Sequence, residues 1–239
     1  MKRCRELLVL AGGFGTRLRS AIGDVPKPLA QVGDRPFLFY LIENWLGQGV
    51  TGLTFLLHHQ AKNIEQFLHQ LKAEGRLRDC DVRTVTEPSP MGTGGAVGHA
   101  VRHFGLRGSF LVANADTWLG AGPSELGEAT APAIAIMATQ NTERYGSVKV
   151  EHGCVAAFQE KQGSVGPGWI NAGLYHLPAD LFVDRPAGAY SLERDIFPQL
   201  AAAGAMRAVP LDGEFIDIGV PADYLKFCEW IKQERKTSL

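Results

Sequence analysis

The chain has 239 residues, of which 45% are hydrophobic, and a formal net charge of −1 at pH 7. This composition is sufficient for a sizeable buried core, and it lacks the basic excess that would indicate a nucleic-acid partner. No apolar stretch approaches the roughly 20 residues of a membrane span, and the four cysteines are far apart, without metal-binding or CxxC spacing. We therefore expect a soluble, cytoplasmic protein with reduced thiols and neither a nucleic-acid nor a membrane partner.

An apolar run at residues 7–11 predicts a strand that is buried on both faces. Residues 12–33 are rich in glycine and proline and show little periodicity, so they predict a long functional loop. A helical pattern then begins near Pro36 and ends at Gly47.

Strands and helices alternate through the rest of the first half. Runs at 53–57, 82–86 and 109–113 predict strands, and patterns at 61–74 and from Gly92 onward predict helices. This alternation is typical of an α/β fold with a doubly wound, mostly parallel, Rossmann-like sheet and helices on both faces.

The second half changes character. It contains predicted strands at 133–138 and 169–177, a hairpin of 147–150 with 155–158, helices at 191–203 and 221–234, and a short strand or loop at 215–218. The hairpin makes the sheet mixed and indicates a ligand-facing part joined to the α/β core. Since no linker or repeat interrupts the chain, we expect a single domain, 1–239, with functional halves of about 1–130 and about 131–239.

A glycine-rich turn, GGFGTRL at residues 12–18, directly follows the first predicted strand. Glycines there allow the backbone to approach a phosphate and aim N–H groups at it, and Arg17 adds a planar charged fork. The turn is not a P-loop, and Leu18 stands where the dinucleotide fingerprint of an oxidoreductase needs its third glycine. A tight turn with a surface arginine is the alternative interpretation.

Lys27 lies between Pro26 and Pro28. The two prolines hold this lysine extended, so ordering it costs little further entropy. Such a lysine suits phosphate binding better than a free surface charge does.

Further motifs follow these two in order. They are Glu87 with GTGGA at 92–96, Asn-Ala-Asp at 114–116, Tyr145-Gly146, Glu160-Lys161, NAGLY at 171–175 and DIGVPADY at 217–224. The set spans nearly the whole chain and resembles the signature of the sugar-phosphate nucleotidyltransferase family. Its spelling is most similar to that of the D-glycero-α-D-manno-heptose 1-phosphate guanylyltransferases, followed by the mannose-1-phosphate guanylyltransferases. The resemblance implies an enzyme that joins a sugar 1-phosphate to a nucleoside triphosphate and releases pyrophosphate, here without the C-terminal left-handed β-helix of many relatives.

The resemblance also implies roles for individual residues. Both reactants are anions, so the reaction needs charge neutralisation and in-line positioning, and the implied cofactor is magnesium (Mg²⁺), which prefers oxygen ligands. The implied metal ligands are Asp116 and Asp217, and the implied catalytic cations are Arg17, Lys27 and Lys161. The first half would bind the nucleotide through Leu10, Ala11, Gly12, Gly13, Gly15, Thr16, Arg17, Lys27, Glu87, Gly92, Thr93 and Asn114. The second half would bind the sugar phosphate through Tyr145, Gly146, Glu160, Lys161, Asn171 and Ala172.

Several of these residues also have ordinary structural interpretations. Asp116 has the alternative of capping a turn, and Glu160-Lys161 that of an exposed charged pair. Trp169 is as compatible with the core or rim as with a sugar pocket, and His58-His59 is expected to be structural or exposed. Acidic neighbours also compete with Asp217 for its role, namely Asp212, Glu214 and Asp223.

Glu87 decides the expected base. Guanine presents N1–H and N2–H₂ side by side, which suits a carboxylate, whereas uracil and thymine present a donor beside an acceptor, which an amide matches. In the family, the residue a few positions before the Gly-Thr-Gly turn often contacts the base, so we expect GTP unless Glu87 faces solvent. Ala115 departs from the glycine or serine of many relatives, but it is small enough for close approach.

A function of a different class is a non-catalytic subunit that binds an NDP-sugar, as some relatives are. Retention of the charged residues favours the enzyme, since a regulatory copy has little need for a metal pair. Heptose and mannose 1-phosphates share the manno ring and differ at one exocyclic carbon, so the choice of sugar stays open, with heptose preferred on motif spelling. The implied partners are GTP and a sugar 1-phosphate, and a homodimer is left open.

Overall fold

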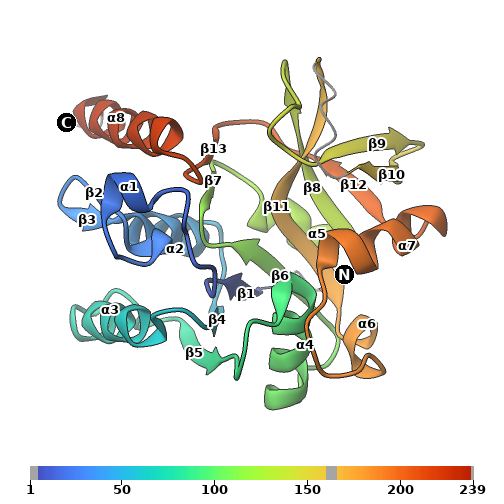
Figure 1. The fold of residues 1–239 in the computed structure, drawn as a ribbon, viewed down its shortest axis with the longest axis horizontal. Helices are drawn as coiled ribbons and strands as arrows, with labels where there is room; N and C mark the ends of the chain where they lie inside the picture. Colours follow the sequence, from blue (N-terminus) through green and yellow to red (C-terminus); the bar gives the residue numbers. More distant parts are fainter. Residues whose placement is uncertain (1–4, 160–165, 238–239) are drawn as a thin grey trace.

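The computed structural model describes residues 5–159 and 166–237. Its main sheet is mixed and has the strand order β5-β4-β1-β6-β11-β8-β12-β10-β9 (Figure 1). These strands are β1 (Glu6–Leu10), β4 (Gly52–Leu57), β5 (Asp81–Thr86), β6 (Ser109–Asn114), β8 (Ala133–Thr139), β9 (Ser147–Glu151), β10 (Cys154–Gln159), β11 (Gly168–Pro178) and β12 (Arg207–Pro210). Two separate ribbons pair β7 (Thr117–Leu119) with β13 (Phe215–Asp217), and β2 (Gln31–Val32) with β3 (Arg35–Pro36).

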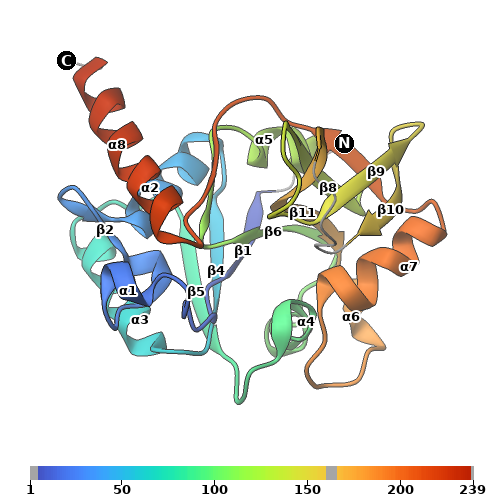
Figure 2. The same cartoon turned by 45° about the horizontal axis from the view of Figure 1, so that its top comes forward.

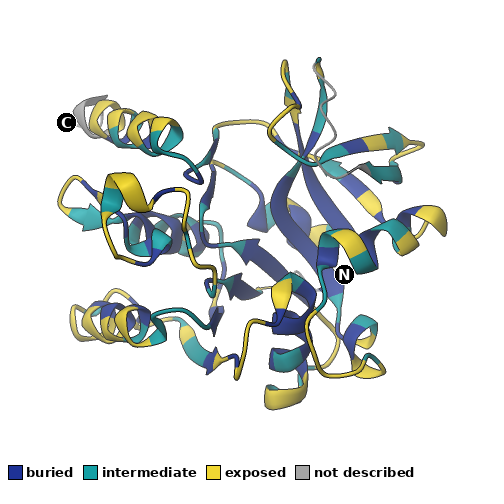
Figure 3. Cartoon of the chain, viewed as in Figure 1, coloured by how far each residue is buried: buried dark blue, intermediate teal, exposed yellow. Residues whose placement is uncertain are grey.

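Strands β5, β4, β1 and β6 run parallel. The inner strands β4, β1 and β6 are apolar because both faces of the sheet are covered there, whereas β5 lies at the edge and is more polar and partly exposed. Leu7 and Val9 of β1 face one core, and Leu8 faces the other. The first core receives side chains from α2 (Phe37–Gly47), α3 (Ala61–Ala73) and α8 (Pro221–Thr237), and the second from α4 (Gly92–Phe104), α6 (Asp180–Val183) and α7 (Phe197–Ala202). The two groups of helices lie on different sides of the sheet (Figure 2). The predicted doubly wound mixed sheet, with helices on both faces, is confirmed. Its central strands are buried, and the exposed residues lie mainly on outer helix faces and in loops (Figure 3).

Strand β11 joins the two halves and changes partner along its length. One edge pairs with β8, while the other pairs with β9 through Trp169 and Ile170 and with β6 through residues 174–178. Between these two ladders Gly173 has a φ of +73°, and a Cβ there would lie 2.7 Å from the side-chain nitrogen of Asn114. The interruption therefore opens the sheet at the carboxyl end of β6, where ligands gather in open α/β sheets.

Two segments differ from their predictions. Residues 12–33 are not wholly a loop, because they contain the short helix α1 (Arg19–Ile22) and a 3-10 turn at Lys27–Leu29. The expected helix at 191–203 is a π-helical turn, Leu192–Ile196, followed by α7. Pro198 has no N–H for the carbonyl four residues earlier, so a regular α-helix cannot run through this point. The short elements β7, α5 (Pro123–Glu128), α6 and β12 were not expected either.

None of the helices in the described part of the chain combines the length and apolarity of a membrane span.

Candidate active site

The ribbon of β7 and β13 brings two distant aspartates together. Asp116 directly precedes β7, and Asp217 ends β13 in register with Thr117. The Ile218 N–H donates to the Asp116 carbonyl at 2.9 Å, which fixes the two chain ends side by side. Both carboxylates therefore lie at the carboxyl end of the parallel strands.

The surroundings of the pair are strongly charged. The Lys27 ammonium donates to Oδ2 of Asp116 at 2.6 Å, and its side chain is only 12% exposed. Burial, followed by the negative charge of Asp116, raises the pKa of Asp217, although the Gly219 N–H, Lys27 and Arg17 act in the opposite direction. The two carboxylates are thus close enough to repel each other, and a bound cation would relieve that repulsion.

Asp116 and Asp217 fit the predicted magnesium site by their chemistry. Mg²⁺ binds to proteins through one or two carboxylates and completes its shell with substrate phosphates and water. The role of both residues as metal ligands stays a prediction.

A cavity of about 370 Å³ lies beside Asp116, and we call it the Glu87 cavity. Its lining includes the predicted nucleotide contacts Leu10, Gly12, Gly13, Glu87, Gly92, Thr93 and Asn114, together with Asp116. Ala11, Gly15 and Lys27 line a smaller hollow next to it, where Ala115 also lies. Of the remaining predicted contacts, Thr16 and Arg17 are exposed, and Arg17 faces a different cavity.

Glu87 does not face bulk solvent, because it is only 8% exposed. Its Oε2 accepts a hydrogen bond from the Met91 N–H at 2.8 Å, while a Cβ on Gly12 would lie 2.8 Å from Oε1. Burial raises the pKa of this carboxyl, although the Met91 hydrogen bond and His58 lower it in part. Gly12 therefore has to be a glycine for Glu87 to keep this position.

His58 and Phe14 line the Glu87 cavity, and His59 packs against Phe14. His58 lines the Glu87 cavity and places its Nδ1 3.3 Å from the Glu87 carbonyl, so it is nearer to a site than the sequence predicted. The half-exposed ring of Phe14 packs against both histidines, with centroid distances of 5.8 Å and 5.0 Å. Phe14 and His58 thus contribute aromatic rings to the wall of this cavity, and His59 contacts the Phe14 ring.

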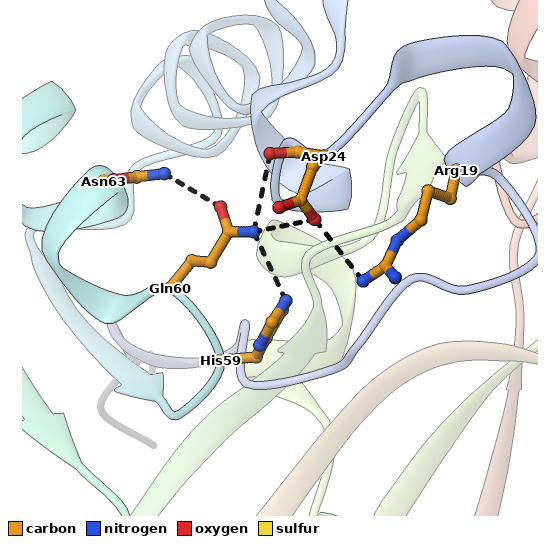
Figure 4. A network of polar contacts seen from close by, with 5 residues as sticks. All are labelled: Arg19, Asp24, His59, Gln60 and Asn63. Carbon is orange, nitrogen blue, oxygen red and sulfur yellow. Dashed lines mark hydrogen bonds and ion pairs between the residues drawn. The ribbon is translucent and has the colours of Figure 1, made fainter.

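The glycine-rich segment is attached to the start of α3 by a polar network (Figure 4). The Gln60 amide nitrogen lies 3.2 Å from Oδ1 of Asp24 and 3.3 Å from Nε2 of His59. The Gln60 side-chain oxygen accepts a hydrogen bond from Asn63 at 2.8 Å, and Arg19 lies 3.4 Å from Asp24. These contacts hold the chain that follows residues 12–18 against the start of α3 and place Gln60 beside His59.

A second cavity, of about 230 Å³, lies on the other side of the aspartates, and we call it the Asp217 cavity. It is lined by the predicted residues Tyr145, Gly146, Asn171 and Arg17, and it shares Asn114 and Asp116 with the Glu87 cavity. Ala172 is fully buried in the first core and does not line this cavity, and its role in sugar binding stays a prediction. Glu160 and Lys161 lie outside the described residues, and Trp169 packs against the second core.

The Asp217 cavity also contains residues that the sequence did not indicate. They are Thr117, Arg144, Phe158, Glu193 and Phe215. Arg144 forms an ion pair with Asp223 and directly precedes the Tyr145-Gly146 motif, so position in the motif was a usable signal. No comparable signal marked Glu193, one of two acidic residues in a helical pattern, the other being Asp195.

Known proteins resemble this chain over almost its whole length. Residues 6–234 match the family model described as Nucleotidyl transferase. A D-glycero-alpha-D-manno-heptose 1-phosphate guanylyltransferase of Campylobacter jejuni is 32% identical over 93% of this chain and 98% of its own. A probable mannose-1-phosphate guanylyltransferase 1 of Oryza sativa is 31% identical over 92% of this chain and 63% of its own.

Among solved structures, HddC from Yersinia pseudotuberculosis, complexed with GMP-PN, is 32% identical to this chain. It superimposes with a TM-score of 0.80 and covers 95% of this chain and 99% of its own. The family expected from the motifs is thereby confirmed: this chain belongs to the nucleotidyl transferase family and is a nucleotidyltransferase.

Proposed function

We propose that this enzyme transfers the guanylyl group of GTP to a sugar 1-phosphate, with D-glycero-α-D-manno-heptose 1-phosphate as the preferred acceptor. The observation that carries the proposal is the wall of Asn114 and Asp116 that the Glu87 cavity and the Asp217 cavity share. A nucleotide in the first cavity and a sugar phosphate in the second would meet at this wall. Such positioning is the main requirement of an in-line displacement between two anions.

In the proposed reaction, an oxygen of the sugar phosphate attacks the α-phosphorus of GTP, and the bond to the pyrophosphate oxygen breaks. No nucleophile from the protein is needed. Lys27 lies 2.6 Å from Asp116 at the shared wall, where its charge would stabilise the phosphate oxygens as negative charge develops. Arg17 would hold the phosphates from the side of the Asp217 cavity, and Lys161 stays the predicted partner of the sugar phosphate.

Asp116 and Asp217 would hold the magnesium ion. When bound, that ion would neutralise further phosphate charge. The raised pKa of Asp217, caused by burial and by Asp116, supports this assignment, since a cation removes the repulsion between the two groups.

Glu87 supports guanine as the base. It is buried, it lines the larger cavity, and its Oε1 is not used by the Met91 N–H, which binds Oε2. A carboxylate in this position matches the adjacent N1–H and N2–H₂ donors of guanine. The names of the relatives and the GMP-PN complex of HddC agree with this choice.

A guanylyltransferase for mannose 1-phosphate is the second candidate, since the rice relative is 31% identical to this chain. To test both, pyrophosphate release is measured with Mg²⁺ for the four common NTPs against heptose, mannose and glucose 1-phosphates. We expect turnover with GTP and a manno-configured phosphate, and the highest kcat/KM with the heptose. Activity confined to UTP or dTTP with glucose 1-phosphate, or no pyrophosphate release with any pair, would overturn the proposal.

A further inference from the structure

Glu193 occupies an unusual backbone element beside the Asp217 cavity. It belongs to the π-helical turn Leu192–Ile196, and the preceding Ser191 caps this turn by accepting the N–H groups of Glu193 and Arg194 at 3.1 Å and 3.2 Å. Single π-helical turns within helices occur frequently at functional sites. The turn also aims Glu193 into the cavity that contains Asn171 and Asp217.

The segment before this turn is held tightly against the start of α4. The Tyr190 carbonyl accepts the N–H groups of Gly94 and Gly95 at 3.0 Å and 3.1 Å. A Cβ on Gly94 would lie 2.4 Å from the Tyr190 ring, and one on Gly98 would lie 2.3 Å from its hydroxyl. These glycines of α4 therefore make room for the Glu193 segment.

Two hydroxyl groups hold one oxygen of the Glu193 carboxylate, and a third hydroxyl lies near the other oxygen. Its Oε2 accepts from Thr93 at 2.7 Å and from Ser191 at 2.6 Å, whereas Oε1 lies 3.5 Å from the Tyr175 hydroxyl. A distance of 3.5 Å is at the outer limit of a hydrogen bond. Oε1 thus keeps most of its capacity to accept a hydrogen bond from a group in the cavity.

Asn171, by contrast, is already committed to the protein. Its amide nitrogen donates to the Tyr175 hydroxyl at 2.9 Å, and its oxygen accepts the Gly173 N–H at 2.9 Å. Of the two side chains, the carboxylate of Glu193 is therefore the better acceptor for a ligand hydroxyl.

We propose that Glu193 determines sugar specificity by accepting a hydrogen bond from one ring or exocyclic hydroxyl of the sugar phosphate through Oε1. This inference rests on the proposed function and assigns a residue of the same site. Thr93 lines the Glu87 cavity, so its hydrogen bond to Oε2 attaches the Glu193 carboxylate to the nucleotide side of the site. A sugar without that hydroxyl would leave a half-buried carboxylate oxygen without its partner, which is costly.

The experiment compares mannose 1-phosphate with its 2-, 3-, 4- and 6-deoxy analogues in the pyrophosphate-release assay with GTP. For the wild type we expect one analogue to lose about 10- to 100-fold in kcat/KM, the value of a hydrogen bond to a charged group. Glu193→Gln should lower kcat/KM for the full sugar but change that analogue little, so that the discrimination falls to within a few-fold, with a nearly unchanged KM for GTP. Glu43→Gln, the same substitution on the outer face of α2, is the matched control and should retain the wild-type discrimination.

Unchanged discrimination in a Glu193→Gln protein that still unfolds cooperatively would overturn the inference. If this variant does not fold, the wild type alone decides, since equal turnover of all four analogues would also overturn it. Failure of the wild type to release pyrophosphate with any substrate pair would instead overturn the proposed function, and this inference with it.

Discussion

Glu87 is the residue on which the proposed base depends. Its carboxylate is buried, and one oxygen is fixed by the Met91 N–H. Inosine triphosphate tests the assignment because it keeps N1–H but lacks the N2 amino group. We expect the wild type to prefer GTP over ITP by about 10- to 100-fold in kcat/KM, as one charge-assisted hydrogen bond predicts. In Glu87→Gln this preference should shrink to a few-fold, and an undiminished preference would show that another group reads the base.

Glu87→Gln should also change the pH dependence of stability. Measuring this effect checks that the variant is folded and that Glu87 is buried as a carboxylate. Burial raises the folded-state pKa of Glu87 above its ordinary value of 4.5, so the folded protein binds this proton more tightly than the unfolded chain does. The buried charge therefore costs no stability below the unfolded pKa, and it costs most once the pH exceeds the folded pKa. Glu87→Gln can still accept the Met91 N–H, so its Tm relative to wild type should be higher at pH 7 than at about pH 4. A variant that is destabilised more at pH 7 than at pH 4 would contradict this account.

Gly12 and Gly13 are neighbours, but only Gly12 is tightly packed. Alanine substitutions at the two positions therefore distinguish an effect on stability from an effect on GTP binding. A Cβ at Gly12 would lie 2.8 Å from Glu87 and 3.1 Å from His58, whereas one at Gly13 meets nothing within 4 Å. Gly12→Ala should therefore lose about 1–3 kcal/mol of stability by overpacking and should also lose GTP affinity. Gly13→Ala should keep the wild-type Tm but raise the KM for GTP if the backbone at Gly13 approaches a phosphate. Equal losses of stability in the two variants, measured by thermal or urea unfolding, would refute this distinction.

The glycines of α4 belong to a packing contact as much as to a ligand site. Gly94→Ala would place its methyl group 2.4 Å from the Tyr190 ring, and we expect a loss of about 1–3 kcal/mol in the free energy of unfolding. Tyr190→Leu in the same chain should recover part of that loss, because it removes the ring that the methyl group meets. Gly47→Ala at the exposed end of α2 is the control, since it has nothing within 4 Å and should be neutral or stabilising by up to about 1 kcal/mol.

The buried strands could be predicted from the sequence, whereas the pairing that builds the site could not. Strands such as β1 and β6 were predicted because continuous apolar runs report burial on both faces, which is a local property. The meeting of Asp116 with Asp217 depends on pairing between β7 and β13, which no local pattern encodes. The same limit applies to Glu193, whose position follows from a π-helical turn and from glycines on a distant helix.

In the whole molecule, the site lies where the parallel strands of the first half meet the mixed second half of the sheet, at the antiparallel pairing of β6 with β11. Strand β11 pairs with β6 on one side of Gly173 and with β9 on the other, so the sheet is open beside Asn114. The chain ends of β6 and β13 then supply the two aspartates at the same opening. One cavity on each side of a charged wall is a direct consequence of this topology.

The position of the two aspartates leads to a prediction about how GTP and Mg²⁺ stabilise the whole protein. If Asp116 and Asp217 hold Mg²⁺ against the phosphates of GTP, then GTP should raise Tm more with Mg²⁺ than with EDTA. At 100 times Kd a ligand contributes about 2.7 kcal/mol, which corresponds to roughly 5–11 °C for a chain of this size. In Asp116→Asn and in Asp217→Asn, the Tm measured with GTP and Mg²⁺ should nearly equal the Tm measured with GTP and EDTA. Each variant should still unfold cooperatively without ligand. A magnesium-dependent shift of wild-type size in both variants would exclude this pair as the metal ligands, whereas loss of the shift in only one would assign the ion to that carboxylate alone.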